Sequence, residues 1–183
     1  MSTLITSTAQ IGTIKDAGGN ATAMTIDSAG RILTPNRPAF RAYIGSTGWT
    51  TLTHNVHQIV PFNTEKHDVG SNFDTSTYRF TCPVDGLYYF SARTYMHSAG
   101  GTLRLSIITG TTSPATDETT FLSQTYYAAN VAQRNGSLLT YTTAVLTANT
   151  QVGCYARHDD DTNNSSYSEN NTLYNHFEGY LIG

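Results

Sequence analysis

No stretch of the chain carries the apolar spacing of an amphipathic helix, and this constrains the fold more than any other feature. Apolar and polar residues instead alternate over short runs, which is the period of a strand with one buried face. Roughly one residue in six is Thr and twelve residues are Tyr, two types that favour a pleated surface. We therefore predict an all-β chain. The expected strands cover residues 39–44, 57–62, 78–81, 86–96, 102–108, 119–128, 137–146, 151–158 and 177–182.

The first 37 residues differ from the remainder of the chain. They contain no aromatic side chain and are rich in Ala, Thr, Ser and Gly. Turn signals at 16–20 and 27–30 flank an alternating run between them. A segment with so few large side chains cannot build its own core, so we expect a short β-rich stem that completes its packing against other copies of itself. Prolines mark its end, and the predicted domains are residues 1–37 and 38–183.

Composition excludes several classes of partner. Charged residues make up 13% of the chain and the net charge is −3, so no basic surface for nucleic acid or an anionic membrane is expected. No apolar run is long enough to cross a bilayer. Residues 1–7 lack the pattern of a secretory signal, so the protein is not exported by that route or its signal is missing. Cys82 and Cys154 are interpreted as small buried residues rather than a disulfide framework.

The most specific pattern lies in residues 62–90. It reads Phe62, five residues, Asp68, four residues, Phe73, six residues, Phe80, five residues, then Gly86-Leu-Tyr-Tyr-Phe90. These spacings resemble the signature of the C1q-like domain family. The chain departs from that signature at Ala92, where the family has an aromatic residue. Residues 177–181 and 38–42 resemble the family's closing and first strands, so the resemblance covers residues 38–183.

The resemblance implies a ten-stranded jelly roll of the C1q and tumour-necrosis-factor type that assembles as a homotrimer. The residues agree, because Tyr88 and Phe90 point to one face of their strand while Leu87 and Tyr89 point to the other. Both faces therefore need cover, one from the second sheet and one from a neighbouring subunit. We expect the sandwich core to include Phe62, Phe80, Tyr88 and Phe90. We expect the trimer interface to include Tyr89, Tyr141 and Phe177.

Two stretches of the first segment, Ile11-Gly-Thr-Ile-Lys-Asp-Ala-Gly-Gly-Asn20 and Met24-Thr-Ile-Asp-Ser-Ala-Gly-Arg-Ile32, resemble the short β-rich leaders of C1q-like proteins in tailed phages. This implies a virion component: a head fibre, a capsid decoration protein or the tip of a tail fibre. Residues 1–37 would dock on other virion proteins. The protein would be made in the host cytoplasm and placed on the virion surface, where its head would attach to a host glycan or receptor. The alternative is a secreted or cell-surface C1q/TNF-like ligand or lectin whose signal peptide is missing.

Catalytic motifs are not found in the sequence. There is no Gly-x-Ser-x-Gly elbow and no phosphate-binding loop. Spacing singles out no pair of carboxylates of the kind that a glycosidase needs. We therefore predict that the protein is not an enzyme and holds no cofactor. A polysaccharide depolymerase is the least favoured alternative.

The polar stretch 159–175 is the remaining candidate for a binding site, and we expect it to form a long loop. Asp159 and Asp161 alternate as calcium ligands do, but the Gly and Glu of an EF-hand are missing, so calcium is only a weak candidate. Tyr167 and Tyr174 are candidates to stack on a sugar, because loops on a rigid sandwich commonly carry binding.

Overall fold

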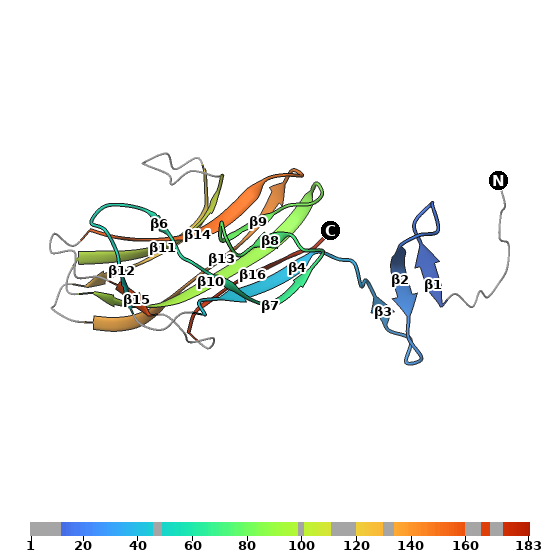
Figure 1. Cartoon of the computed structure of the whole chain (residues 1–183), viewed down its shortest axis with the longest axis horizontal. Coiled ribbons are helices and arrows are strands. Elements are labelled where there is room, and N and C mark those ends of the chain that lie inside the picture. Colours follow the sequence, from blue (N-terminus) through green and yellow to red (C-terminus); the bar gives the residue numbers. More distant parts are fainter. Residues whose placement is uncertain are drawn as a thin grey trace. The chain divides into compact units, whose positions relative to one another are not determined.

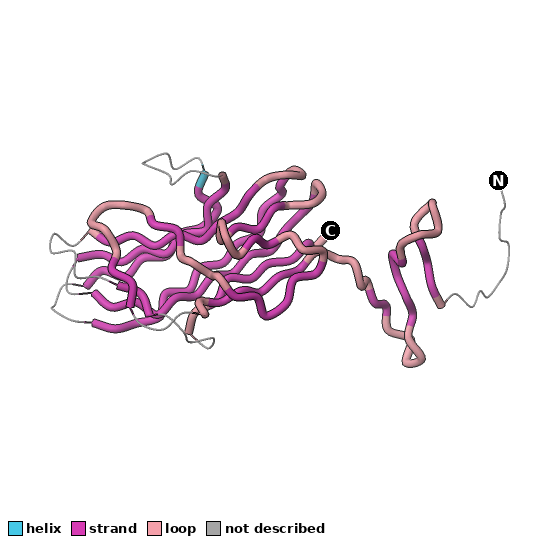
Figure 2. Tube along the Cα trace, viewed as in Figure 1, coloured by secondary structure: helices cyan, strands magenta, loops and turns pink. Residues whose placement is uncertain are grey.

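The computed structural model describes residues 12–45, 49–98, 101–110, 120–129, 134–159, 166–168 and 174–183. Strands dominate this part of the chain, as Figure 2 shows, and the all-β prediction is confirmed. The chain divides into two compact units, residues 1–37 and 38–183, and each is described by itself. Among the described residues, none belongs to a helix with the length and apolarity that a membrane span requires.

The first unit holds a three-stranded antiparallel sheet in the order β1-β2-β3 (Figure 1). Its strands are β1 (Thr13–Lys15), β2 (Thr22–Ile26) and β3 (Ile32–Leu33). The turn signals identified in the sequence connect these strands. The Asp16 carboxylate accepts hydrogen bonds from the backbone N–H groups of Asn20 and Ala21 at 2.7 and 2.9 Å, which closes the turn between β1 and β2.

The second unit is a sandwich of two sheets (Figure 1), and the predicted jelly roll is confirmed. The seven-stranded sheet runs β5-β15-β10-β16-β4-β7, with β13 on the other edge of β10. Its strands are β4 (Ala39–Tyr43), β5 (Trp49–Thr51), β7 (Thr64–Val69), β10 (Gly86–Ser98), β13 (Arg134–Leu146), β15 (Ser166–Ser168) and β16 (His176–Leu181). The six-stranded sheet runs β12-β11-β14-β9-β8, with β6 on β14. Its strands are β6 (Gln58–Ile59), β8 (Phe73–Asp74), β9 (Arg79–Thr81), β11 (Gly101–Thr109), β12 (Phe121–Ala129) and β14 (Gln151–His158).

Aromatic rings fill much of the space between the two sheets. Phe40 of β4 lies among them, with its ring centroid 4.8 Å from those of Phe73 and Phe80 and 4.9 Å from that of Phe177. The four residues expected in the core are fully buried here: Phe62, Phe80, Tyr88 and Phe90. The Tyr88 hydroxyl donates to the Val84 carbonyl at 2.7 Å, so this buried ring keeps its polar group satisfied.

Both cysteines lie in the same core as free thiols. Burial raises the pKa of the Cys82 thiol to about 11, and burial also raises the pKa of Cys154. Both side chains therefore stay protonated at neutral pH and are poor nucleophiles.

Several strands differ from the sequence-based prediction. Within residues 57–62 only β6 is a strand, whereas β7 was not predicted. Strand β7 reads Thr-Glu-Lys-His-Asp-Val and lies at the edge of its sheet, where it pairs with β4. Because an edge strand buries little surface, this sequence lacks the apolar alternation by which strands are predicted. The predicted loop over 159–175 is also interrupted, because β15 pairs with both β10 and β5.

Candidate functional site

The exposed side of the seven-stranded sheet is the candidate site. Alternate residues of β10 point away from the core, and these include Leu87, Tyr89, Ser91 and Arg93. Residues that stand directly opposite each other in an antiparallel pair share a face. The register of β10 with β13 and β16 then places further residues beside them: Leu139, Tyr141, Thr143, Val145, His176, Glu178 and Tyr180. We call this surface, together with Arg41 of β4 and Ile182, the outer face.

Large apolar side chains of the outer face are open to solvent. The exposed fractions are 81% for Val145, 65% for Tyr141, 49% for Leu139 and 44% for Tyr180. The rings of Tyr89 and Tyr180 lie 5.2 Å apart, centroid to centroid. Several large apolar residues on neighbouring strands form the kind of surface that marks an interaction site.

Strand β13 shows the bias most clearly. Its outward residues include Leu139, Tyr141 and Val145, whereas the inward positions between them hold Thr140, Thr142 and Ala144. Leu138 and Leu146 in the inward phase join the core, so β13 carries apolar residues on both sides, whereas a strand with one face in water carries them on its inward side. The outer side of β13 therefore carries the composition of a covered surface.

Polar and charged side chains of β4 and β16 form a band within the outer face. The Arg41 guanidinium lies 3.0 Å from the Glu178 carboxylate, and Nε2 of His176 lies 4.0 Å from the other oxygen of Glu178. Burial holds the pKa of His176 below its usual value, opposed by Glu178 and assisted by Arg41 and Arg93. The imidazole is therefore neutral at neutral pH, and Arg41 and Glu178 form the charged pair of this band.

Two of the three predicted interface residues lie on the outer face, and one does not. Tyr89 is half-buried and Tyr141 is exposed there. Phe177 points inward, stands opposite Ala92 and is fully buried in its own sandwich. Its assignment to the interface is therefore corrected to a core position. The outward aromatic residue of the same strand is Tyr180, which the sequence reasoning did not select.

The predicted ligand residues have different surroundings. Tyr174 is 43% exposed; its ring packs 5.7 Å from that of Tyr95 and 5.8 Å from the guanidinium carbon of Arg93. Tyr167 belongs to β15, where its backbone stands opposite Met96 and Thr50. Its side chain lies outside the described part of the structure.

Asp159 is engaged with protein partners. One carboxylate oxygen accepts from the backbone N–H of Thr102, and the other lies 3.3 Å from the Arg104 guanidinium. Burial acts to raise the pKa of Asp159, but Thr102, Arg104 and Arg157 together hold it below its usual value. Asp161 lies outside the described residues. Within the residues that are described, no group of three or more His, Cys, Asp or Glu side chains is placed to hold a metal ion.

Comparison with known proteins matches residues 42–182 to the family described as the C1q domain. No curated protein matches the chain. Similar solved structures include the globular domain of zebrafish complement 1qA protein, with 23% identity, a TM-score of 0.50, and coverage of 80% of this chain and 98% of that one. Eiger TNF from S. frugiperda has 11% identity, a TM-score of 0.57, and coverage of 80% and 94%. Murine APRIL has 9% identity, a TM-score of 0.59, and coverage of 80% and 99%. At these identities the likeness concerns the fold.

Proposed function

The chain belongs to the C1q domain family, and on that premise we propose that it is a non-enzymatic homotrimer whose subunits meet through the outer face. The observation that carries the proposal is the exposed apolar side of β13, with Leu139, Tyr141 and Val145 outward. Covering these side chains removes apolar surface from water, which stabilises the trimer by roughly 25 cal/mol for each Å² buried. The Arg41–Glu178 pair lies within the same surface and would fix the register of the subunits.

The solution mass of the unaltered chain, and of a variant with one charge added to the outer face, tests the trimer. Light scattering is expected to give three times the 19.9 kDa of one chain. Val145→Asp is expected to give single chains, because an isolated carboxylate resists burial in an interface. Val145 is 81% exposed in the single chain, so the substitution leaves the sandwich itself intact.

Val56→Asp provides the matched control, since Val56 is also exposed, at 43%, and lies outside the outer face. It is expected to keep the mass of the unaltered protein. A monomeric unaltered chain, or a Val145→Asp variant that stays trimeric, would contradict the assignment of the outer face.

We further propose that the trimer is a virion protein: a head fibre, a decoration protein or a tail-fibre tip. Residues 1–37 would dock on the particle, and the head would attach to a host glycan or receptor. Support comes from the N-terminal sheet, a separate unit in which none of the described residues 12–37 is buried. A sheet in this condition needs another surface to pack against.

Deletion of residues 1–37 separates docking from folding. The shortened chain is expected to keep the trimeric mass and the thermal unfolding of the head, because the core lies entirely in residues 38–183. It is expected to be lost from purified particles. Incorporation of the shortened chain at the normal level would argue against a docking role. Binding to a cell-surface receptor without any particle association would favour the alternative of a secreted ligand or lectin.

A further inference from the structure

The N-terminal sheet has one apolar face. Ile14 stands opposite Met24, and Ile26 stands opposite Ile32. Met24 and Ile26 are two residues apart on β2 and so point to the same side. We call these four side chains the stem face. Ile14 is 41% exposed, Ile26 40% and Ile32 64%.

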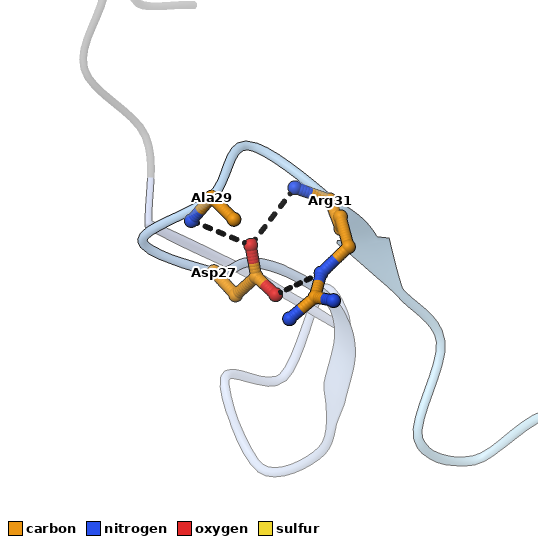
Figure 3. A network of polar contacts seen from close by, with 3 residues as sticks. All are labelled: Asp27, Ala29 and Arg31. Atoms are coloured by element: carbon orange, nitrogen blue, oxygen red, sulfur yellow. Dashed lines mark hydrogen bonds and ion pairs between the residues drawn. The ribbon is translucent and has the colours of Figure 1, made fainter.

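Turn chemistry holds this face in register. The Asp27 carboxylate accepts from the backbone N–H groups of Ala29 and Arg31, both at 2.9 Å, and from Nε of Arg31 at 2.7 Å (Figure 3). These hydrogen bonds from Arg31 lower the pKa of Asp27, so the carboxylate stays ionised at neutral pH. The closed turn brings β3 back beside β2 and sets Ile32 against Ile26.

Charged groups of the sheet are tied into its turns. Nζ of Lys15 donates to the Gly19 carbonyl at 3.2 Å, Asp16 closes the first turn, and Arg31 pairs with Asp27 in the second. The stem face itself consists of three Ile and one Met. Lys15 stands opposite Thr22, beside this face, but its ammonium group is held by the Gly19 carbonyl of the turn. The four apolar side chains themselves are suited to an apolar partner.

The sheet also lacks a core of its own. None of the described residues 12–37 is buried, and a unit below roughly 40 residues usually needs disulfides, metals or oligomerisation to hold its fold. Both native cysteines lie in the other unit. The same apolar face of a second copy is a surface that can cover the stem face.

We propose that the stem faces of three copies pack against one another, so that the N-terminal sheets form a second trimer contact. This inference rests on the proposed trimer of the head. At the start of the head the Leu181 N–H donates to the Pro38 carbonyl at 3.0 Å, and Ala39 stands opposite Tyr180. Each chain thus enters its head beside a strand of the outer face. Three stems tethered there share an effective concentration on the order of 1 mM.

The opposite side of the sheet has a different composition. It carries Thr13, Ala23, Thr25 and Leu33, since Thr25 stands opposite both Thr13 and Leu33. This side stays outside the stem contact and is available to the particle. The stem then has one surface for self-association and another for docking.

Cross-linking of adjacent cysteine variants in the full chain tests the inference. Ile32→Cys places a thiol on the stem face, and Leu33→Cys places one on the opposite side at a similarly exposed position, 48% against 64%. Cys82 and Cys154 are buried and contribute no background. Mild oxidation is expected to give a covalent dimer for Ile32→Cys, with a yield that does not fall on dilution. Leu33→Cys is expected to remain a single chain under denaturing conditions.

Solution mass separates failure of this inference from failure of the head trimer. If both cysteine variants are trimeric by light scattering but Ile32→Cys does not cross-link, or Leu33→Cys cross-links equally, the stem contact is wrong and the head trimer stands. If the unaltered chain is monomeric, both proposals fail. Ile26→Asp provides a second readout: in a trimeric head it is expected to speed proteolysis of residues 1–37, whereas Ala23→Asp on the opposite side is not.

Discussion

Replacing Phe40 by Ala is expected to lower the free energy of unfolding of the head by about 3–5 kcal/mol, the usual cost of removing a buried Phe ring. Phe40 is 1% exposed and stacks on Phe73 and Phe80, with an edge contact to Phe177. Its loss leaves a cavity lined by large rings that cannot all move to fill it. Urea unfolding at a fixed protein concentration measures the change, because subunit association also contributes to stability.

Two control variants show whether the loss of stability in Phe40→Ala comes from the buried ring. Phe40→Leu keeps most of the apolar volume and is expected to cost clearly less than Phe40→Ala. Tyr126→Ala removes a ring that is 69% exposed and is expected to change the free energy of unfolding by no more than about 0.5 kcal/mol. Equal effects of Phe40→Ala and Tyr126→Ala would contradict the central role of Phe40 in the core.

The core was predictable from the sequence because its aromatic residues follow strand alternation. Tyr88 and Phe90 are two apart and lie on one face, as expected. Phe177 shows the limit of this reasoning, because its strand carries apolar residues on both sides. Alternation separates Phe177 from Tyr180 but does not say which of them faces the core. Only the pairing with β4 and β10 decides it, and that pairing joins residues far apart in the sequence.

The outer face left a signal in the sequence that was only partly used. Leu139, Tyr141 and Val145 share one phase of β13, and the other phase also carries apolar residues, Leu138 and Leu146. Of these three residues, only Tyr141 was expected at the interface, although a strand that is apolar on both sides needs cover on both. Asp159 was proposed as a calcium ligand because sequence spacing does not show that Thr102 and Arg104 occupy its oxygens.

Gly179→Ala is expected to lower the free energy of unfolding by about 3 kcal/mol, at the upper end of the usual cost of overpacking. A Cβ atom at this position would lie 2.5 Å from Cδ1 of the Phe90 ring and 2.8 Å from the Tyr89 carbonyl oxygen. Gly179 stands opposite Phe40 on one side and Phe90 on the other, so the ring of Phe90 can retreat only into the aromatic core. The backbone of β10 is held by pairing along both edges. The added methyl group must therefore push β16 away from β10.

Gly136→Ala is the matched control, since the same change in β13 meets no atom within 4 Å. It is expected to be neutral or slightly stabilising, because Ala loses less backbone entropy than Gly on folding. Thermal and urea unfolding of the two variants show how the same added methyl group changes stability at a closely packed position and at an open one. Equal stability of Gly179→Ala and Gly136→Ala would show that β16 has room for a methyl group beside β10. The close approach of Phe90 would then not explain the glycine at position 179.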